Sequence, residues 1–376
     1  MLTFQGLAAA QALFQKPVKV LGDPAYIGTA SSPNLLEGNG PNAVEGRELS
    51  GPTGIALDTS VSPPIVYIAD SFNNRVLGYQ YATQLTPGAY ADVILGQIDR
   101  FSNLAQGPGA RSTGLHQPTG IAVDAAGNVY VADTQNNRIL RFPKPMAQPM
   151  GSAQFPDMAI GQTSFNSSTA NAGGVGAGTL SLAATQLRNG IAFDSAGNLW
   201  VADTGNNRVL RFPSAALKAG QSGAKADLVV GQPDFVTTAP GATVRNSKTG
   251  LNAPQGLGFD SAGRLLVGDN LSRVVVYAPG IASNAAVASR IAGVDTAQPT
   301  VPATQIQLFG PLGVTGTSAG LIVADSGNNR IVFFPTVDKW PVESTQFSPS
   351  ATQVAARLRT RLRCRIRVTA MLRPCR

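Results

Sequence analysis

The sequence predicts an all-β fold, a β-propeller of four-stranded antiparallel blades, on three observations. Glycine is abundant, at 41 residues, while only 13% of residues are charged, which is typical of many short strands joined by turns. One phrase recurs five times along the chain, and a shorter second phrase recurs between its copies. Each repeat thus holds four strand-like runs, and tandem units of four strands describe the blades of a propeller.

The first phrase supplies three of the four strands. Its clearest copy runs from Pro118 to Phe142 and contains GIAVD, NVYVAD and NRILRF, which we name strands a, b and c. The same text returns as RNGIAFDSAGNLWVADTGNNRVLRFP at 188–213, and looser copies begin at Pro52, Pro254 and Pro311. The arginine that opens strand c recurs at spacings of 63, 70, 65 and 57 residues.

The second phrase supplies strand d. It reads VILGQIDRF at 93–101, MAIGQTSF at 158–165 and LVVGQPDF at 228–235, with weaker forms at 18–26 and 290–295. The chain therefore contains five recognisable blades. A fragment of a six-bladed parent is the alternative, and an unclosed ring of that kind would expose strand edges.

The residue types fit this geometry. Strand a alternates small residues such as Gly120 and Ala122 with bulky ones, as expected for the strand that lines the crowded central channel. The b–c loop runs from Asp133 through an Asn pair to Arg138. The Asn pair suits left-handed turns, and the aspartate and arginine are placed to form an ion pair across the hairpin end.

These phrases resemble the NHL repeat. The pattern P-x-G-I-A-x-D, then Y-V-A-D, then N-N-R-V/I-L-R-F, covers most of residues 18–335 in five copies. The resemblance implies a six-bladed propeller of the TolB-like superfamily, a bacterial source and export from the cytoplasm. Three copies depart from the pattern: the copy at 254–277 lacks the Asn pair, the copy at 52–79 has a longer a–b connection, and the copy at 311–334 lacks the strand-a aspartate.

The repeat register predicts how the chain is organised. Residues 1–22 read as the end of a blade whose strand d closes the last one, residues 23–335 as the propeller, and residues 336–376 as an irregular basic tail. Its last twenty residues, Arg357 to Arg376, hold eight arginines and no acid, and the composition changes inside an expected strand d. We expect a foreign or out-of-frame extension there; a native tail that binds an anion, RNA or a membrane surface is the alternative.

Metal and catalytic motifs are sparse. The chain has one histidine, His116, and both cysteines lie in the tail. The zinc site of related lyases needs three or four nitrogen or sulfur ligands, so the sequence argues against it. Three of the four glutamates, Glu37, Glu45 and Glu48, share one loop. They provide the alternative of a divalent cation such as Ca²⁺ in a metal-dependent hydrolase or lyase; a solvated acidic loop is the plainer interpretation.

The charge distribution argues against nucleic acid as a partner. The net charge is +8, but outside residues 357–376 there are 21 basic and 21 acidic residues. Each loop arginine also has an aspartate five residues or fewer upstream. No apolar run is long enough to span a membrane, and the N-terminus lacks the basic region of a signal peptide.

The sequence therefore favours a non-catalytic, monomeric scaffold that needs no cofactor and binds a protein, peptide or glycan. The b–c loops and the long d–a connections leave a propeller on the same face, which we name the long-loop face, and variable loops on a rigid scaffold are where recognition usually occurs. An extracytoplasmic location is expected from the resemblance alone. The candidate ligand-binding residues are the loop arginines Arg75, Arg138, Arg208, Arg273 and Arg330.

Overall fold

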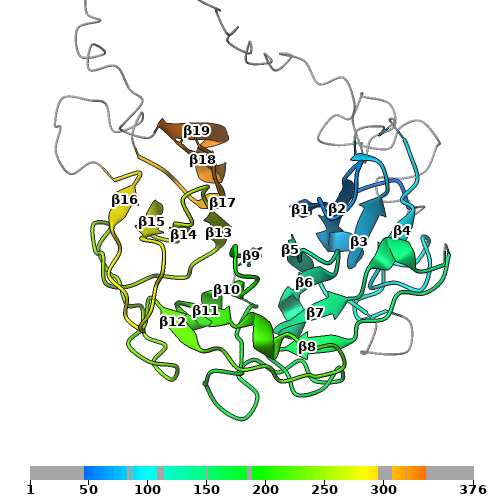
Figure 1. The fold of residues 1–376 in the computed structure, drawn as a ribbon, viewed down its shortest axis with the longest axis horizontal. Helices are drawn as coiled ribbons and strands as arrows, with labels where there is room; N and C mark the ends of the chain where they lie inside the picture. The colour runs from blue at the N-terminus through cyan, green and yellow to red at the C-terminus, as the bar shows by residue number, and fades with distance from the viewer. Residues whose placement is uncertain are drawn as a thin grey trace, which may run out of the picture. The chain divides into compact units, whose positions relative to one another are not determined.

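The computed structural model describes residues 46–335 except 83–84, 86–87, 108–113, 150, 184–188, 295–306 and 319. The chain divides into two units, residues 1–333 and 334–376, and the blades belong to the first. The described part holds five antiparallel sheets in chain order, arranged as a propeller (Figure 1). The predicted closing strand within residues 1–22 and the tail 336–376 lie outside the described residues.

Each blade contains strands in the order a, b, c, d from the centre to the rim (Figure 1). The a strands are β1 (Pro52–Asp58), β5 (Pro118–Val123), β9 (Ile191–Phe193), β13 (Gly256–Phe259) and β17 (Pro311–Gly316). The b strands are β2 (Ile65–Asp70), β6 (Val129–Asp133), β10 (Leu199–Asp203), β14 (Leu265–Asp269) and β18 (Gly320–Asp325).

The outer half of each blade follows the same repeat. The c strands are β3 (Arg75–Tyr79), β7 (Arg138–Phe142), β11 (Arg208–Phe212), β15 (Arg273–Tyr277) and β19 (Arg330–Pro335). The d strands are β4 (Val93–Leu95), β8 (Met158–Ile160), β12 (Leu228–Val230) and β16 (Arg290–Ala292). Among the described residues, the fifth blade has strands a to c. The predicted five blades are thus confirmed.

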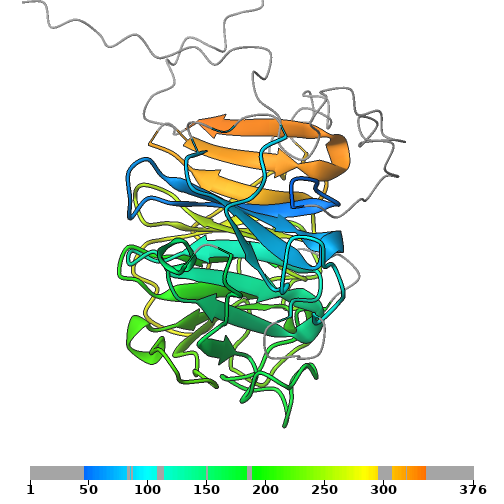
Figure 2. The ribbon, with the colours of Figure 1, turned by 90° about the vertical axis from the view of Figure 1, so that its right-hand side faces the viewer.

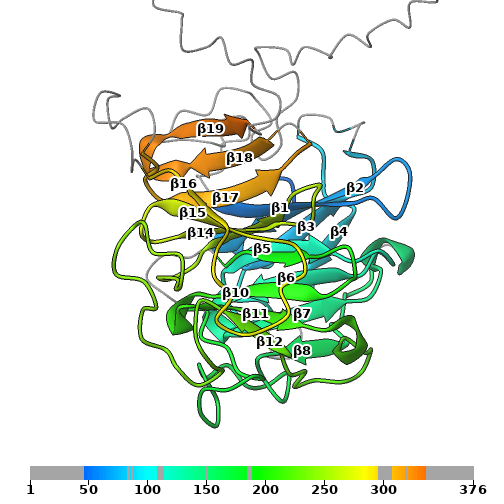
Figure 3. The same ribbon diagram turned by 60° about the vertical axis from the view of Figure 1, so that its left-hand side comes forward.

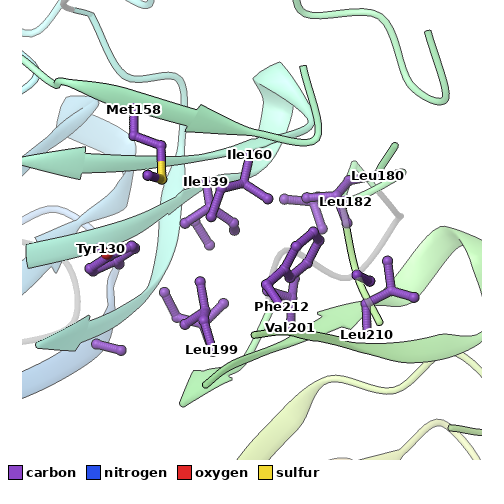
Figure 4. Packing of buried hydrophobic residues seen from close by; sticks show 14 of the residues in the cluster. Tyr130, Ile139, Met158, Ile160, Leu180, Leu182, Leu199, Val201, Leu210 and Phe212 are labelled. Carbon is purple, nitrogen blue, oxygen red and sulfur yellow. The ribbon is translucent and has the colours of Figure 1, made fainter. Parts of the chain in front are cut away.

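The core lies between neighbouring blades. All five residues of β6, β10 and β14 are buried, since each of these sheets packs on both faces. Between the second and third blades, Met158 and Ile160 of one sheet meet Leu199 and Val201 of the next (Figure 4). Leu180, from the connection between these blades, belongs to the same cluster. These strands are apolar on both faces, because burial of both faces removes the need for polar residues at alternate positions.

Small residues allow the a strands to approach one another at the centre. A Cβ added to Gly120 would lie 2.1 Å from the carbonyl oxygen of Asn189, in the next blade. Gly54 has the same relation to Thr119. Residues of β1, β5, β13 and β17, with Asn189 and Gly190 just before β9, line a central cavity of about 440 Å³. This places strand a at the channel, as the alternation of small and bulky residues predicts.

The strands run between two loop faces (Figure 2; Figure 3). One is the long-loop face. The a–b turns and the c–d connections lie at the other ends of the strands, on what we name the short-turn face. The described part of the chain contains no helix with the length and hydropathy of a membrane span.

Candidate functional site

The b–c loop of each blade is organised around its aspartate. In the third blade, Asp203 accepts hydrogen bonds from Arg208 Nε at 2.7 Å, Asn206 Nδ2 at 2.8 Å and the backbone N–H of Ser181 at 2.7 Å. The aspartate and the arginine of the b–c loop form an ion pair within every blade, with nitrogen–oxygen distances of 2.6 to 2.8 Å. The expected ion pair across the hairpin end is therefore present in all five.

The arginine extends this contact to the connections on either side of the blade. Arg208 Nη2 donates to the carbonyls of Gly176 and Thr179, in the connection that enters the blade, at 3.0 Å. Its Nη1 donates to the carbonyl of Phe235, in the connection that leaves it. Arg75 does the same with the carbonyls of Glu48 and Arg100, at 3.0 and 2.8 Å. Arg75, Arg138 and Arg208 thus fix both adjoining connections to their blades. The carbonyls that accept from Arg273 all lie in the connection that enters its blade.

Burial distinguishes one of the five predicted ligand-binding arginines from the rest. The side chains of Arg75, Arg138, Arg208 and Arg273 are at most 1% exposed, whereas that of Arg330 is 32% exposed. Burial raises the pKa of the paired carboxyls Asp133 and Asp203, and the neighbouring guanidinium opposes this rise. The geometry of the four buried arginines supports a structural role. Ligand binding by the arginines stays a prediction, with Arg330 the most accessible of them.

In the first three blades, the Asn pair links the blade to the next one. Its second member adopts the left-handed conformation, with φ of 53° at Asn74, 51° at Asn137 and 55° at Asn207. The side-chain oxygen of Asn207 accepts a hydrogen bond at 2.7 Å from the N–H of Ala253, just before the next a strand. In the fourth blade, which lacks the pair, Ser272 takes the left-handed position with φ of 58°. The left-handed turn that the Asn pair predicts is confirmed.

The Gly-Gln of the second phrase has a structural role that the sequence alone did not reveal. Gln162 Nε2 donates to the carbonyls of Asn137 and Thr169, at 3.2 and 2.8 Å. The fourth blade has Val294 at this position. There Arg245 reaches in from the preceding connection, and its Nη2 donates to the carbonyl of Ser272 at 2.7 Å. One arginine thus replaces the missing glutamine.

A recurring leucine supports the same loops and was also missed. The glycine of each Gly-Gln or Gly-Val pair has a positive φ of 84° to 89° and covers a leucine of the following connection. At Gly231, an added Cβ would meet Leu251 Cδ1 at 2.7 Å. The sequence signal is a leucine three residues before the strand-a proline in three copies. These leucines are Leu115, Leu251 and Leu308, with Leu180 as the fourth.

The predicted cation site is only partly within the described residues. Glu37 and Glu45 lie outside them. Glu48 is buried and pairs with Arg47, whose Nε lies 3.1 Å from Glu48 Oε1. Within the described ranges, no three His, Cys, Asp or Glu side chains gather closely enough to hold a metal ion. The metal-dependent alternative stays a prediction.

The long-loop face carries exposed apolar side chains on the anchored connections. Phe101 and Leu104 follow β4 and are 61% and 60% exposed, and Val236 follows β12 and is 64% exposed. Arg100 lies over the ring of Phe101 at 4.9 Å. Other large apolar residues on this face that are more than half exposed are Phe72, Ile98, Val244 and Phe309. His116 is half-buried, and its backbone N–H donates to Asp133.

Comparisons with known proteins agree with the repeat pattern. The family model described as "NHL repeat" matches residues 115–142 and 189–212. A search of curated proteins gives no significant match. Among solved structures, one titled as a nidogen/laminin complex is 17% identical, with a TM-score of 0.41, and the match covers 76% of this chain and 75% of that one.

Two further solved structures have similar scores. Virginiamycin B lyase from Staphylococcus aureus is 15% identical, with a TM-score of 0.35, over 76% of this chain and 85% of that one. Aldose sugar dehydrogenase from Streptomyces coelicolor is 16% identical, with a TM-score of 0.40, over 78% and 80%. Scores at this level carry no inference about activity. The chain is a five-bladed β-propeller that contains NHL repeats at residues 115–142 and 189–212.

Proposed function

We propose that this propeller is a non-catalytic binding scaffold and that its long-loop face binds a protein, peptide or glycan. One observation carries the proposal: connections held by buried arginines present exposed apolar side chains. Phe101 is exposed, yet the residue before it, Arg100, has its carbonyl bound by Arg75. Val236 follows Phe235, whose carbonyl is bound by Arg208.

Fixing a loop before binding reduces the entropy lost when the complex forms. Exposed apolar and aromatic side chains on such loops then supply contact area at low cost, and this combination is typical of recognition surfaces. A location outside the cytoplasm is expected only from the family resemblance and stays a prediction, as does the monomeric state.

Binding of the full chain to a glycan array and a peptide library tests the proposal. The affinity of each hit is then measured for the wild type and two double variants. Phe101→Ser with Val236→Ser removes apolar side chains from the long-loop face. Phe155→Ser with Val287→Ser removes the same residue types, 63% and 64% exposed, from the short-turn face. We expect the first pair to weaken binding at least tenfold and the second to change it less than twofold. Equal losses, or no hit in either collection, would contradict the proposal.

A further inference from the structure

A second cavity lies between the first two blades, on the short-turn face. Its volume is about 600 Å³, within the range of small-molecule sites. The a–b turns and the segments after strand c of both blades line it. The walls include Val61, Ile65 and Met146, which are apolar, and the polar lining includes Asp58 and Tyr67.

Other blades show how the strand-a aspartate is normally satisfied. One oxygen of Asp194 accepts backbone N–H groups of its own turn, and the other accepts Asn198 Nδ2 and Trp200 Nε1, both at 2.9 Å. In the second blade, Asn128 Nδ2 donates to the second oxygen of Asp124 at 2.8 Å. In the fourth blade, Arg264 has this role. In all three blades, a side chain of the blade itself thus donates a hydrogen bond to the second carboxylate oxygen.

The first blade lacks that partner. Its turn after Asp58 reads TSVSPP and contains no asparagine. Asp58 Oδ1 accepts the N–H and the hydroxyl of Ser60, at 2.9 and 2.5 Å, but Oδ2 has no hydrogen-bond partner among the described residues. The residue is only 3% exposed. Asp58 lines the cavity, so a ligand with an N–H group can supply the donor that Oδ2 lacks within its own blade.

Tyr67 also lines this cavity, and its hydroxyl lies in the protein interior behind the lining. It is fully buried, and its hydroxyl has no hydrogen-bond partner. Burial and the nearby charge of Asp58 raise its pKa, so the phenol keeps its proton. The hydroxyls of Tyr79 and Tyr277 are also buried without a partner, but neither lines this cavity.

The packing of the next blade also differs here. Tyr67 occupies the repeat position of Tyr130 and Trp200, since all three pair with an alanine two residues before the strand-a aspartate. Tyr130 packs edge-on against Phe193 of the following blade at 5.0 Å, and Trp200 against Phe259 at 5.9 Å. The first interface has Val123 at the corresponding position.

We propose that this cavity binds a small amphipathic amine, with its ammonium group on Asp58 Oδ2 and its apolar part against Val61, Ile65 and Met146. An ammonium group supplies both the opposite charge and the hydrogen-bond donor that the Asp58 carboxylate lacks within its own blade. The exposed Lys144 is the other charged lining residue. The site is on the face opposite the long loops, so it goes beyond the proposed function and is independent of it.

Calorimetric titration of the full chain with 2-phenylethylamine, n-hexylamine and cyclohexylmethylamine tests this site. We expect saturable binding of at least one amine, and much weaker binding of 2-phenylethanol and 3-phenylpropionate, which share the skeleton of the first amine. Asp58→Asn should weaken amine binding at least tenfold. Asp194→Asn, the same change at the same repeat position away from the cavity, should leave it unchanged.

A second variant keeps the test sharp if Asp58→Asn fails to fold. Tyr67→Trp places an indole N–H where Trp200 donates to Asp194, so the protein itself should satisfy Asp58. We expect this variant to fold and to lose amine binding, while Phe101→Ser with Val236→Ser keeps it. The proposal is overturned if none of the three amines binds, if 2-phenylethanol binds as tightly as its amine, or if a folded Asp58→Asn or Tyr67→Trp variant binds like the wild type.

Discussion

Arg208 has an acceptor for each nitrogen of its guanidinium group: one carboxylate oxygen and three backbone carbonyls. Such a buried arginine is not interchangeable with other polar residues, because its planar fork reaches several acceptors at fixed angles. Its role is to join two connections and one carboxylate, and Arg75 and Arg138 do the same in the first two blades.

Replacing Arg208 by Gln is expected to destabilise the fold by about 3–5 kcal/mol, because it leaves Asp203 charged and buried without its partner. Arg211 is three residues further along the same strand and pairs with Asp227 at 2.8 Å, with side chains 23% and 41% exposed. Arg211→Gln should therefore cost only about 1 kcal/mol or less. Chemical denaturation of both variants checks the difference, and similar losses would argue against the structural role of Arg208.

Asp194 should make stability depend on pH. Burial by itself would raise its pKa, but hydrogen bonds from Trp200 and Asn198 lower it overall. A carboxyl with a lowered pKa stabilises the folded state fully above the ordinary aspartate value of about 3.9, and this contribution disappears as the pH falls through the lower folded-state pKa.

Wild type should therefore be more stable than Asp194→Asn at pH 7, and the gap should narrow as the pH falls below about 4. Thermal unfolding of both proteins between pH 7 and the acid limit of folding measures this gap. A gap that stays constant or widens toward acid pH would show that the carboxylate charge is not the source of the stability.

At the scale of elements, the end of strand d depends on a glycine and the leucine beneath it. Gly231→Ala should lose about 1–2 kcal/mol from the left-handed backbone and about 1–3 kcal/mol more from the contact with Leu251. Gly220→Ala isolates the first contribution, since Gly220 has φ of 73° and no atom within 4 Å of an added Cβ. Equal destabilisation of the two variants, measured by denaturation, would mean that the leucine contact is unimportant.

The fourth blade allows a test of whether Arg245 takes the role that the glutamine after strand d has in the other blades. Arg245→Ala removes the hydrogen-bond donor of the Leu271 and Ser272 carbonyls. We expect this change to destabilise the protein by about 1–3 kcal/mol. Adding Val294→Gln restores the glutamine of the other blades and should recover part of that loss. If the double variant is no more stable than Arg245→Ala, Arg245 does not take the place of the glutamine of the other blades.

The strands were predictable because each one coincides with an apolar run of the repeated sequence. The recurrence of Asp133 and Arg138 at the same positions in every copy also indicates that they form an ion pair at the b–c turn. The orientation of the arginine was not predictable, since its carbonyl acceptors belong to connections whose sequences share little: Gly114, Thr179 and Gly250. The cavity at Asp58 could not be predicted from the sequence either. It depends on a missing donor and on what the neighbouring blade packs there, and a single sequence shows neither until the blades are placed side by side.

At the scale of the whole molecule, the first and last described blades carry exposed apolar residues. Ile55 and Leu57 of β1 are 70% and 52% exposed, and Ile331 and Phe333 of β19 are 70% and 48% exposed. The corresponding strands of the middle blades are largely buried, because a blade packs on each side of them. The proposed binding face, in contrast, is formed by connections that buried arginines of the first and middle blades hold in place.

Native-state hydrogen exchange of the full chain tests that claim most directly. The amides of Ser181 and Ala253 lie in connections, but they donate to Asp203 and Asn207. They should exchange as slowly as amides in the adjacent strands. Arg208→Gln should release protection in the connections around residues 176–181 and 235–239 while β6 and β7 stay protected. Rapid exchange of these connection amides in the wild type would contradict a long-loop face that is fixed before it binds.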